Sequence, residues 1–396
     1  MKSDLDPSAE KIQIIDLTRT LAIAMVMAFH LKPTLPLPSL FFRWGWDHFQ
    51  RNGEYGVCIF FVISGFLITR IIDLGPGGLT NPGWKWFYAR RIGRIVPLFL
   101  FSIALGLIFN LIFRDGSKHF NYCFKLPAHP DDPLFWGSLF TATFNWVEAF
   151  YAGLWKGLGI HWLIFWSLAV EEQFYLFYPL VLKKLRTRQN ITGFLIFIII
   201  SAYLWRLGLF LGGEENISVS MRVFIGSFDQ IALGALLYLV YKQTRRYFAS
   251  NQRGCWVLVA LGAAIIITNH LATFCIGETL DRVYAPSITA IGLFLLLLGG
   301  MNLAFFDSKH LKIFSLPGKY SYGNYLCHIS VLYFIHSFLW NLNIVIAFLV
   351  YISVATMVSA ISYHYFEVPA NLFVREHLWA GKNVLKNKGT RNKGFE

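Results

Sequence analysis

The sequence predicts an all-α polytopic membrane protein with about ten transmembrane helices and with both termini in the cytoplasm. The 396 residues are 56% hydrophobic and only 14% charged, whereas an average soluble domain is roughly one quarter charged. The apolar residues occur in runs close to the about 20 residues that a helix needs to cross a bilayer. A soluble fold could not bury this much apolar surface, so an ordinary soluble enzyme, a disordered chain and a collagen-like chain are excluded.

Ten apolar segments mark the expected helices. They are residues 15–32, 56–73, 95–113, 160–182, 191–211, 222–241, 255–274, 284–303, 321–340 and 343–366. The longest connection, 114–159, is rich in Pro, Trp and Phe, which predicts a semi-buried aromatic segment in place of a free linker. The opening MKSDLDPSAEKIQIID is too polar for a cleavable signal peptide. We expect one transmembrane domain over 1–370 and a basic cytoplasmic tail over 371–396.

The distribution of basic residues predicts the orientation. With the N-terminus in the cytoplasm, the inner segments hold 23 Lys and Arg and the outer segments hold 9. This is the bias that the positive-inside rule describes, and an even number of spans returns the Lys-rich tail to the cytoplasm. Topology and contact with anionic lipid therefore account for the net charge of +13, and we expect no nucleic-acid partner.

The five Cys residues predict neither a disulfide framework nor a metal site. They are scattered, with no CxxC motif and no Cys/His cluster, at positions 58, 123, 255, 275 and 327. Both kinds of site need Cys or His at close and regular spacing. We therefore expect no metal and no permanently bound cofactor.

The first apolar segment carries three ionisable residues, Asp16, Arg19 and His30. At 100° per residue they share one helix face, with His30 about 16 Å beyond Arg19 toward the outer side. Charge inside a bilayer is costly, so each is a site candidate, and an imidazole suits proton transfer near neutral pH. Asp16 lies about 21 Å from His30, so we expect it to pair with Arg19 in a structural ion pair. The alternative is that His30 only marks the helix boundary.

The stretch FYARRIGRIVPL brings Arg90, Arg91 and Arg94 to the cytoplasmic end of the third segment. Arg91 and Arg94 are three residues apart on a helix, so their guanidinium groups can converge, and guanidinium groups suit phosphate. Together with Arg19 at the same depth they predict a cationic cytoplasmic mouth. The alternative is a basic membrane anchor, which is common.

The fourth segment, WSLAVEEQFYLFYPL, contains adjacent carboxylates at Glu171 and Glu172. Ser167, Glu171 and Tyr175 follow the spacing of one helix face, whereas Glu172 points about 100° away. Two neighbouring intramembrane Glu residues are hard to explain as packing alone. For one of them, a buried ion pair with an Arg from another helix is the alternative.

Three weaker signals complete the set of candidates. Ser64 and Gly65 in FFVISGFLIT allow close approach of another helix. His328 in SYGNYLCH is either a site residue or a helix contact, and Glu367 in YHYFEVP ends the last apolar segment. Each signal alone is weak.

Together these motifs resemble the acyltransferase-3 family of integral-membrane acyltransferases. The resemblance extends from the first to the last apolar segment. It is carried by Asp16, Arg19 and His30, FFVISGFLIT at 60–69, Arg91 and Arg94 with Ile95 and Pro97, WSLAVEEQFYLFYP at 166–179, SYGNYLCH at 321–328 and FEVP at 366–369. It implies a ten-helix protein of the bacterial inner (plasma) membrane that moves an acyl group, often acetyl, from cytoplasmic acyl-CoA to a hydroxyl of a surface or exported glycan or glycolipid.

Two departures from the family pattern bear on the site. Many members have a His just before the Trp-Ser pair of the fourth segment; in this chain Ile164 stands near that place, and His161 lies one turn earlier. We therefore assign no role to His161. Some members also carry a soluble esterase-like domain after the helices, which we do not expect here, and a step that needs such a domain would require a partner protein.

The resemblance and the charge pattern fit one mechanism. Three arginines would hold the phosphates of the donor acyl-CoA: Arg19, Arg91 and Arg94. His30 would act as general base on the acceptor hydroxyl, oriented by Glu171, or by Glu172, from another helix. The candidates for substrate binding or oxyanion stabilisation are Ser64, Tyr175 and His328. Direct transfer and an acyl-His intermediate are both open.

The main alternative is a proton-coupled transporter or exporter of a surface-polymer precursor, because intramembrane Glu, Arg and His also build proton pathways. The sequence lacks the internal repeat typical of such transporters. A non-catalytic assembly or flipping partner is a second alternative. The expected ligands are acyl-CoA, a glycan or lipid-linked saccharide, and membrane lipid. The aromatic segments 41–49 and 134–146 could stack on sugars or form an interfacial belt, and the oligomeric state is open.

Overall fold

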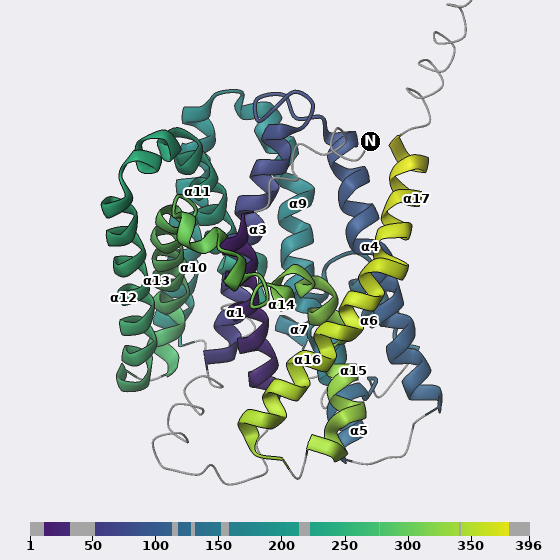
Figure 1. Cartoon of the computed structure of the whole chain (residues 1–396). Coiled ribbons are helices and arrows are strands. Elements are labelled where there is room, and N and C mark those ends of the chain that lie inside the picture. Colours follow the sequence, from purple (N-terminus) through teal and green to yellow (C-terminus); the bar gives the residue numbers. More distant parts are fainter. Residues whose placement is uncertain are drawn as a thin grey trace, which may run out of the picture.

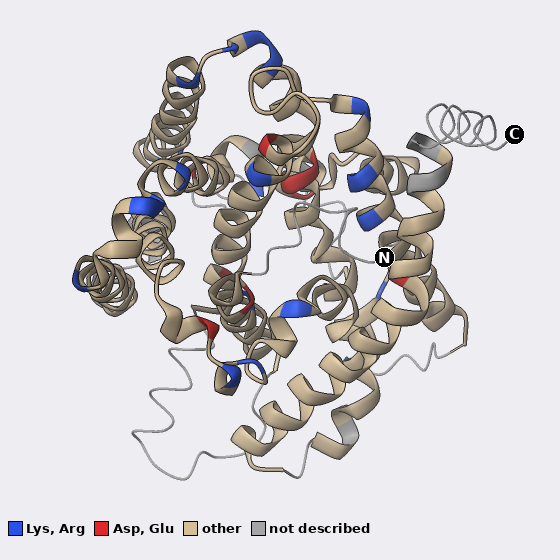
Figure 2. Ribbon diagram, turned by 45° about the horizontal axis from the view of Figure 1, so that its top comes forward, with Lys and Arg blue, Asp and Glu red and all other residues tan. Residues whose placement is uncertain are grey.

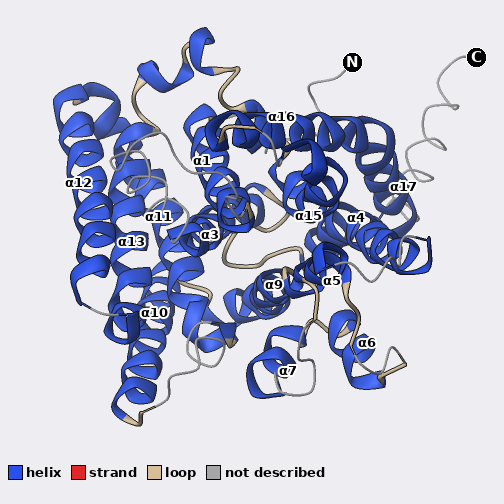
Figure 3. Ribbon diagram, turned by 90° about the horizontal axis from the view of Figure 1, so that it is seen from below, coloured by secondary structure: helices blue, strands red, loops and turns tan. Residues whose placement is uncertain are grey.

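The computed structural model describes residues 12–31, 52–112, 118–127, 131–151, 158–213, 222–276, 278–339 and 342–379, and these ranges contain helices and no strand (Figure 3). The helices are α1 Gln13–His30, α3 Tyr55–Leu74, α4 Trp84–Ile112, α5 Lys118–Phe124, α6 Pro133–Phe140, α7 Phe144–Tyr151, α8 Ile160–Leu163, α9 Phe165–Leu185, α10 Arg188–Leu211, α11 Phe224–Ser250, α12 Gln252–Ile276, α13 Glu278–Gly300, α14 Leu316–Lys319, α15 Ser321–Leu339, α16 Ile344–Ser362 and α17 Val368–Trp379 (Figure 1). Short 3-10 turns lie at Asn52–Glu54, Ala304–Asp307 and Lys309–Leu311, and a π-helical turn, Tyr363–Glu367, joins α16 to α17.

The all-helical class is confirmed, and each of the ten predicted apolar segments contains a helix. Several helices are longer than predicted. α4 begins at Trp84, α11 ends at Ser250, and the last predicted segment continues through the π turn into α17. The extensions of α4 and α11 are rich in basic and aromatic residues, which a hydropathy pattern does not count toward the apolar length.

Within the described residues, six helical stretches are long and apolar enough to cross a membrane. They are Asn52–Leu74, Trp84–Ile112, Arg188–Leu211, Gln252–Ala272, Val283–Gly300 and Ile344–Val374. The other predicted spans fall on α1, α9, α11 and α15, which carry many of the ionisable and amide side chains of the bundle. Figure 2 shows that charged positions are sparse along the helices and that many Lys and Arg positions lie at turns and helix ends.

The bundle has two groups of helices with a central set between them. Figures 1 and 3 show α10 to α13 side by side on one flank and α4, α15, α16 and α17 on the other. α1, α3 and α9 lie between the groups; α3 contacts α11, α1 and α9, and α1 also contacts α14 and α15. The central helices are therefore covered by neighbours from both groups.

Two glycines bring the α3 and α11 backbones into direct contact. A Cβ on Gly65 would lie 1.9 Å from the Ile231 carbonyl oxygen, and a Cβ on Gly234 would lie 1.9 Å from the Val62 carbonyl oxygen. The expectation that the Ser64-Gly65 pair allows close approach is confirmed. Because each glycine faces the other helix, neither helix can slide without a clash.

The connection 114–159 folds back onto the bundle in its described parts. α5, α6 and α7 bury Phe124, Phe135 and Phe144 almost completely against α4, α8 and α9. This confirms the predicted semi-buried segment, and it gives Phe135 and Phe144 of the aromatic segment 134–146 a core role. The aromatic segment 41–49 and the tail residues 380–396 lie outside the described residues.

Gly234→Ala is expected to lower the free energy of unfolding by about 1–3 kcal/mol, because the added methyl group overlaps the α3 backbone. Gly193→Ala is the matched control: Gly193 also lies inside a helix, but a Cβ there meets nothing within 4 Å. Thermal melting of the purified protein in detergent compares the two. Equal melting midpoints for both variants would contradict the close α3–α11 contact.

Candidate active site

A cavity of about 100 Å³ lies among α1, α3, α4, α9 and α15. Six of the ten predicted site residues line it: Arg19, Ser64, Arg91, Arg94, Glu171 and Tyr175. The remaining wall consists mainly of apolar and aromatic side chains, among them Phe60, Phe61, Tyr322 and Tyr325. Asp16, Glu172, His30 and His328 are not part of this lining. We name this space the donor cavity, after the acyl donor that the family resemblance leads us to expect.

Two hydroxyl groups hold the Glu171 carboxylate. Ser64 on α3 donates to Oε1 at 2.8 Å, and Tyr175, one turn along α9, donates to Oε2 at 2.7 Å. A hydroxyl carries a single proton, so neither group has a second proton for an oxyanion while it binds Glu171. The roles predicted for Ser64 and Tyr175 in substrate binding or oxyanion stabilisation stay predictions, and an oxyanion would have to compete with Glu171 for their protons. The predicted partner of Glu171 was His30, whereas these two contacts of the carboxylate are with hydroxyls.

Three arginines bring positive charge to one end of the donor cavity. The Arg91 guanidinium lies 4.9 Å from the centre of the Tyr175 ring and 5.8 Å from that of Phe87. Its Nη2 atom is buried and has no hydrogen-bond partner in the described part of the chain. Arg94 lines the same cavity. Because a buried guanidinium nitrogen without a partner is energetically unfavourable, this end of the cavity favours an anionic ligand.

Arg19 reaches the cavity from α1 and is joined there to Asp16. Its Nη1 lies 3.6 Å from the Asp16 Oδ1, and both side chains are mostly buried. A Cβ on Gly318 would lie 1.8 Å from the Asp16 carbonyl oxygen, and the Gly318 amide donates to Thr20 Oγ1 at 2.9 Å. The short helix α14 therefore fixes the part of α1 that carries the ion pair. Arg90, which precedes Arg91 on α4, does not line the cavity. Its guanidinium carbon lies 4.8 Å from the centre of the Trp86 ring.

Glu172 faces away from the donor cavity, as the 100° offset predicts. Its Oε1 atom is buried, and no described group donates a hydrogen bond to it. It lies within electrostatic range of Arg91 and Tyr322. Glu172 therefore adds negative charge behind the arginine end of the cavity without entering it.

The structure brings His30 together with His328. The two imidazole centres are 5.3 Å apart, with the rings tilted by 42°. His328 is fully buried, and its Nδ1 lies 2.7 Å from the Tyr325 carbonyl oxygen, so that nitrogen carries the proton. Its Nε2 has no hydrogen-bond partner among the described residues. Tyr325 lines the donor cavity, and the histidine pair therefore lies directly behind that wall.

His161 and Glu367 pack against neighbouring helices outside the donor cavity. The His161 Nε2 lies 3.0 Å from the Ser102 carbonyl oxygen, and a Cβ on Gly106 would lie 2.7 Å from it, so the ring packs tightly against α4. Glu367 ends the π turn, and a Cβ on Gly323 would lie 3.1 Å from its Oε1. Neither residue lines the donor cavity.

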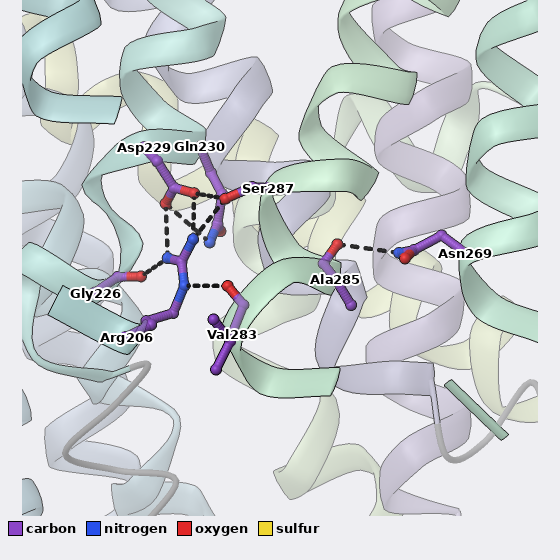
Figure 4. Close-up of polar contacts among 8 residues, drawn as sticks. All are labelled: Arg206, Gly226, Asp229, Gln230, Asn269, Val283, Ala285 and Ser287. Atoms are coloured by element: carbon purple, nitrogen blue, oxygen red, sulfur yellow. Dashed lines mark hydrogen bonds and ion pairs between the residues drawn. The ribbon is translucent and has the colours of Figure 1, made fainter. Parts of the chain in front are cut away.

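A buried ion pair that the sequence did not predict joins three helices (Figure 4). Arg206 on α10 binds Asp229 on α11 through Nη1 at 3.1 Å and Nη2 at 2.8 Å, and both side chains are completely buried. Ser287 on α13 donates to Asp229 at 2.6 Å, and Arg206 also donates to the Val283 carbonyl at 3.0 Å. The signal was present: an Asp in one apolar segment and an Arg in the preceding one are both costly in a bilayer.

A family model described as an acyltransferase domain matches residues 12–364. The peptidoglycan O-acetyltransferase OatA of Listeria monocytogenes is 28% identical over 345 residues, which make up 84% of this chain and 51% of that relative. The O-acetyltransferase OatA of Staphylococcus aureus is 26% identical over 376 residues, 90% of this chain and 56% of that relative. The chain spans about half the length of these curated relatives. No solved structure matches it.

Asp229→Asn is expected to lower the free energy of unfolding by about 3–5 kcal/mol, because it leaves the Arg206 charge buried without its counter-charge. The double variant Arg206→Met, Asp229→Leu removes both charges and is expected to recover most of the loss. Melting midpoints in detergent measure both. A single variant as stable as the wild type would show that the pair is solvated.

Proposed function

Since the chain belongs to the acyltransferase-3 family, we propose that it is an integral-membrane O-acyltransferase that moves an acetyl group from cytoplasmic acetyl-CoA to a hydroxyl of a surface or exported glycan. The observation that carries the proposal is the donor cavity, which is lined by three arginines from two helices, by Glu171 and otherwise mainly by apolar and aromatic side chains. Two of its relatives bear the name O-acetyltransferase, one of them for peptidoglycan. A glycan hydroxyl is therefore the acceptor class that we propose.

In the proposed topology, ten helices cross the membrane and both termini lie in the cytoplasm. Six apolar helical stretches within the described residues support this. So do the large apolar side chains exposed on α10, α12 and α16, among them Phe197, Val257 and Leu349, because exposed apolar faces of this kind suit lipid. The excess of Lys and Arg on the inner segments supports the orientation. The relatives are bacterial, and we assign the protein to the inner (plasma) membrane.

The donor is held at its anionic end. Arg91, Arg94 and Arg19 bind the phosphates of acetyl-CoA, and the unpartnered Nη2 of Arg91 gains a charge-assisted hydrogen bond when the ligand binds. The pantetheine arm then extends along the apolar wall formed by Phe60, Phe61 and neighbouring residues. This directs the thioester away from the arginines and toward the other end of the cavity.

His30 is the general base of the proposed reaction. It takes the proton of the acceptor hydroxyl, whose oxygen forms a bond to the thioester carbonyl carbon, and the carbon–sulfur bond breaks. The proton on His30 then passes to the departing CoA thiolate. His328, whose ring centre lies 5.3 Å from that of His30, carries its proton on Nδ1, so its Nε2 lone pair can accept a hydrogen bond from the charged His30 imidazole. Glu171, held by two hydroxyls, balances the charge of the arginines and keeps Tyr175 beneath Arg91.

Arg91→Met is expected to weaken acetyl-CoA binding by roughly 10–100-fold, because it removes charge-assisted hydrogen bonds to phosphate. The matched control is Arg90→Met, which removes an adjacent arginine that lies over Trp86 and outside the cavity lining. Equilibrium binding of labelled acetyl-CoA to protein in lipid nanodiscs measures both. Equal weakening in the two variants would point to a general basic surface and against a specific donor site.

His30→Ala is expected to lower acceptor-dependent release of CoA thiol by roughly 10²–10⁴-fold while acetyl-CoA binding is kept, since only the proton transfer is lost. His377→Ala on the exposed face of α17 is the control. Thiol release is followed with purified protein, acetyl-CoA and glycan fragments. Full activity of His30→Ala would overturn the mechanism, and a wild type that binds no acyl-CoA would overturn the proposed function in favour of proton-coupled transport.

A further inference from the structure

We propose that a second, smaller cavity between α3, α9 and α11 is the subsite that receives a hydroxyl or acetamido group of the sugar acceptor. The inference rests on the proposed function, because it assumes a glycan acceptor. The cavity has a volume of about 20 Å³, and its polar lining residues are Glu54, Arg222, Ser227 and Gln230. We name it the acceptor cavity.

The acceptor cavity adjoins the donor cavity. Val57 and Phe61, one helical turn apart on α3, line both spaces. A group bound in the acceptor cavity is therefore separated from the donor cavity by a single layer of side chains. The acceptor cavity lies near the first residues of α3, and in the proposed topology this is the outer side, from which an exported glycan arrives.

Gln230 supplies a hydrogen-bond acceptor that has no partner. The residue is completely buried, and its Oε1 atom is not bonded to any group that the structure describes. Its Nε2 lies 3.4 Å from the Asp229 Oδ1. Asp229 is itself fixed by Arg206 and Ser287 (Figure 4). A rotated amide would direct Oε1 against the Asp229 carboxylate, so the ion pair keeps Nε2 toward Asp229 and leaves Oε1 without a donor among the described residues.

The lining chemistry indicates a hydroxyl-bearing, uncharged sugar. An unpartnered carbonyl oxygen needs a donor, which the O–H of a sugar or the N–H of an acetamido group provides. Within the lining, Arg222 forms an ion pair with Glu148 at 2.7 Å and lies 5.3 Å from the centre of the Trp166 ring. The pair neutralises the Arg222 charge and Glu54 adds a carboxylate, so the acceptor cavity does not select an anion. About 20 Å³ is enough for one hydroxyl or one water, and only a substituent of the sugar enters.

Binding of chitotetraose, a neutral oligomer of N-acetylglucosamine, tests the inference directly. Wild-type protein in nanodiscs is expected to bind it. Gln230→Leu is expected to bind it at least about tenfold more weakly, with acetyl-CoA affinity unchanged. Asn269→Leu is the control, because it removes a buried amide that bonds to Ala285 and Thr289 and lines neither cavity. Its chitotetraose affinity is expected to match that of the wild type.

Ser227→Val provides a second variant if Gln230→Leu does not fold, because the larger side chain fills the acceptor cavity. It is expected to weaken chitotetraose binding to a similar degree. Unchanged sugar affinity in a folded Gln230→Leu or Ser227→Val protein, or a wild type that does not bind the sugar, would overturn the inference and assign the cavity to an ordered water. Failure of the proposed function is a separate result, since it appears as absence of acetyl-CoA binding by the wild type.

Discussion

Charge buried in an apolar bundle must be balanced by groups from other helices, and this constraint governs the arrangement of the central helices. Glu171 on α9 is bound by Ser64 on α3. Asp229 on α11 is bound by Arg206 on α10 and Ser287 on α13. Lipid offers no hydrogen bond to replace these contacts. The helices with these groups are therefore tied to one another at defined heights, and the apolar helices around them supply the covering surface.

The same contacts position the chemistry. Ser64 and Tyr175 fix Glu171, and the Tyr175 ring in turn lies beneath the Arg91 guanidinium. A chain of contacts thus runs from α3 through α9 to α4 and sets the place of a positive charge inside the donor cavity. On the other side, the Arg206–Asp229 pair orients the Gln230 amide. One buried carboxylate supports each cavity, Glu171 the donor cavity and Asp229 the acceptor cavity. The side chains that hold these carboxylates have no contact with a ligand in the proposed reaction.

The sequence predicted the helices and their polar faces, but it did not predict which faces meet. Spacing along one helix brings Glu171 and Tyr175 to a common face, and the structure joins them. Ser64 and His328 lie far from their partners in sequence, and their contacts with Glu171 and His30 depend on how α3 and α15 pack. Asp229 was missed for the same reason, because its role needs Arg206 and Ser287 from other helices. Helix ends such as that of α11 extend past the apolar segment because hydropathy measures apolar length alone.

The contact between Gly65 and the Ile231 carbonyl lies beside Ser64 of the donor cavity and Gln230 of the acceptor cavity. In the proposed reaction, this backbone contact therefore fixes the spacing between the two substrates, and side-chain rotation cannot lengthen it. A descendant of this protein could accept a bulkier acyl group or a different sugar only by exchanging the side chains that separate the cavities, Val57 and Phe61, while both glycines are kept. Substrate range and fold can thus diverge independently during evolution, since the former depends on two replaceable side chains and the latter on main-chain contact.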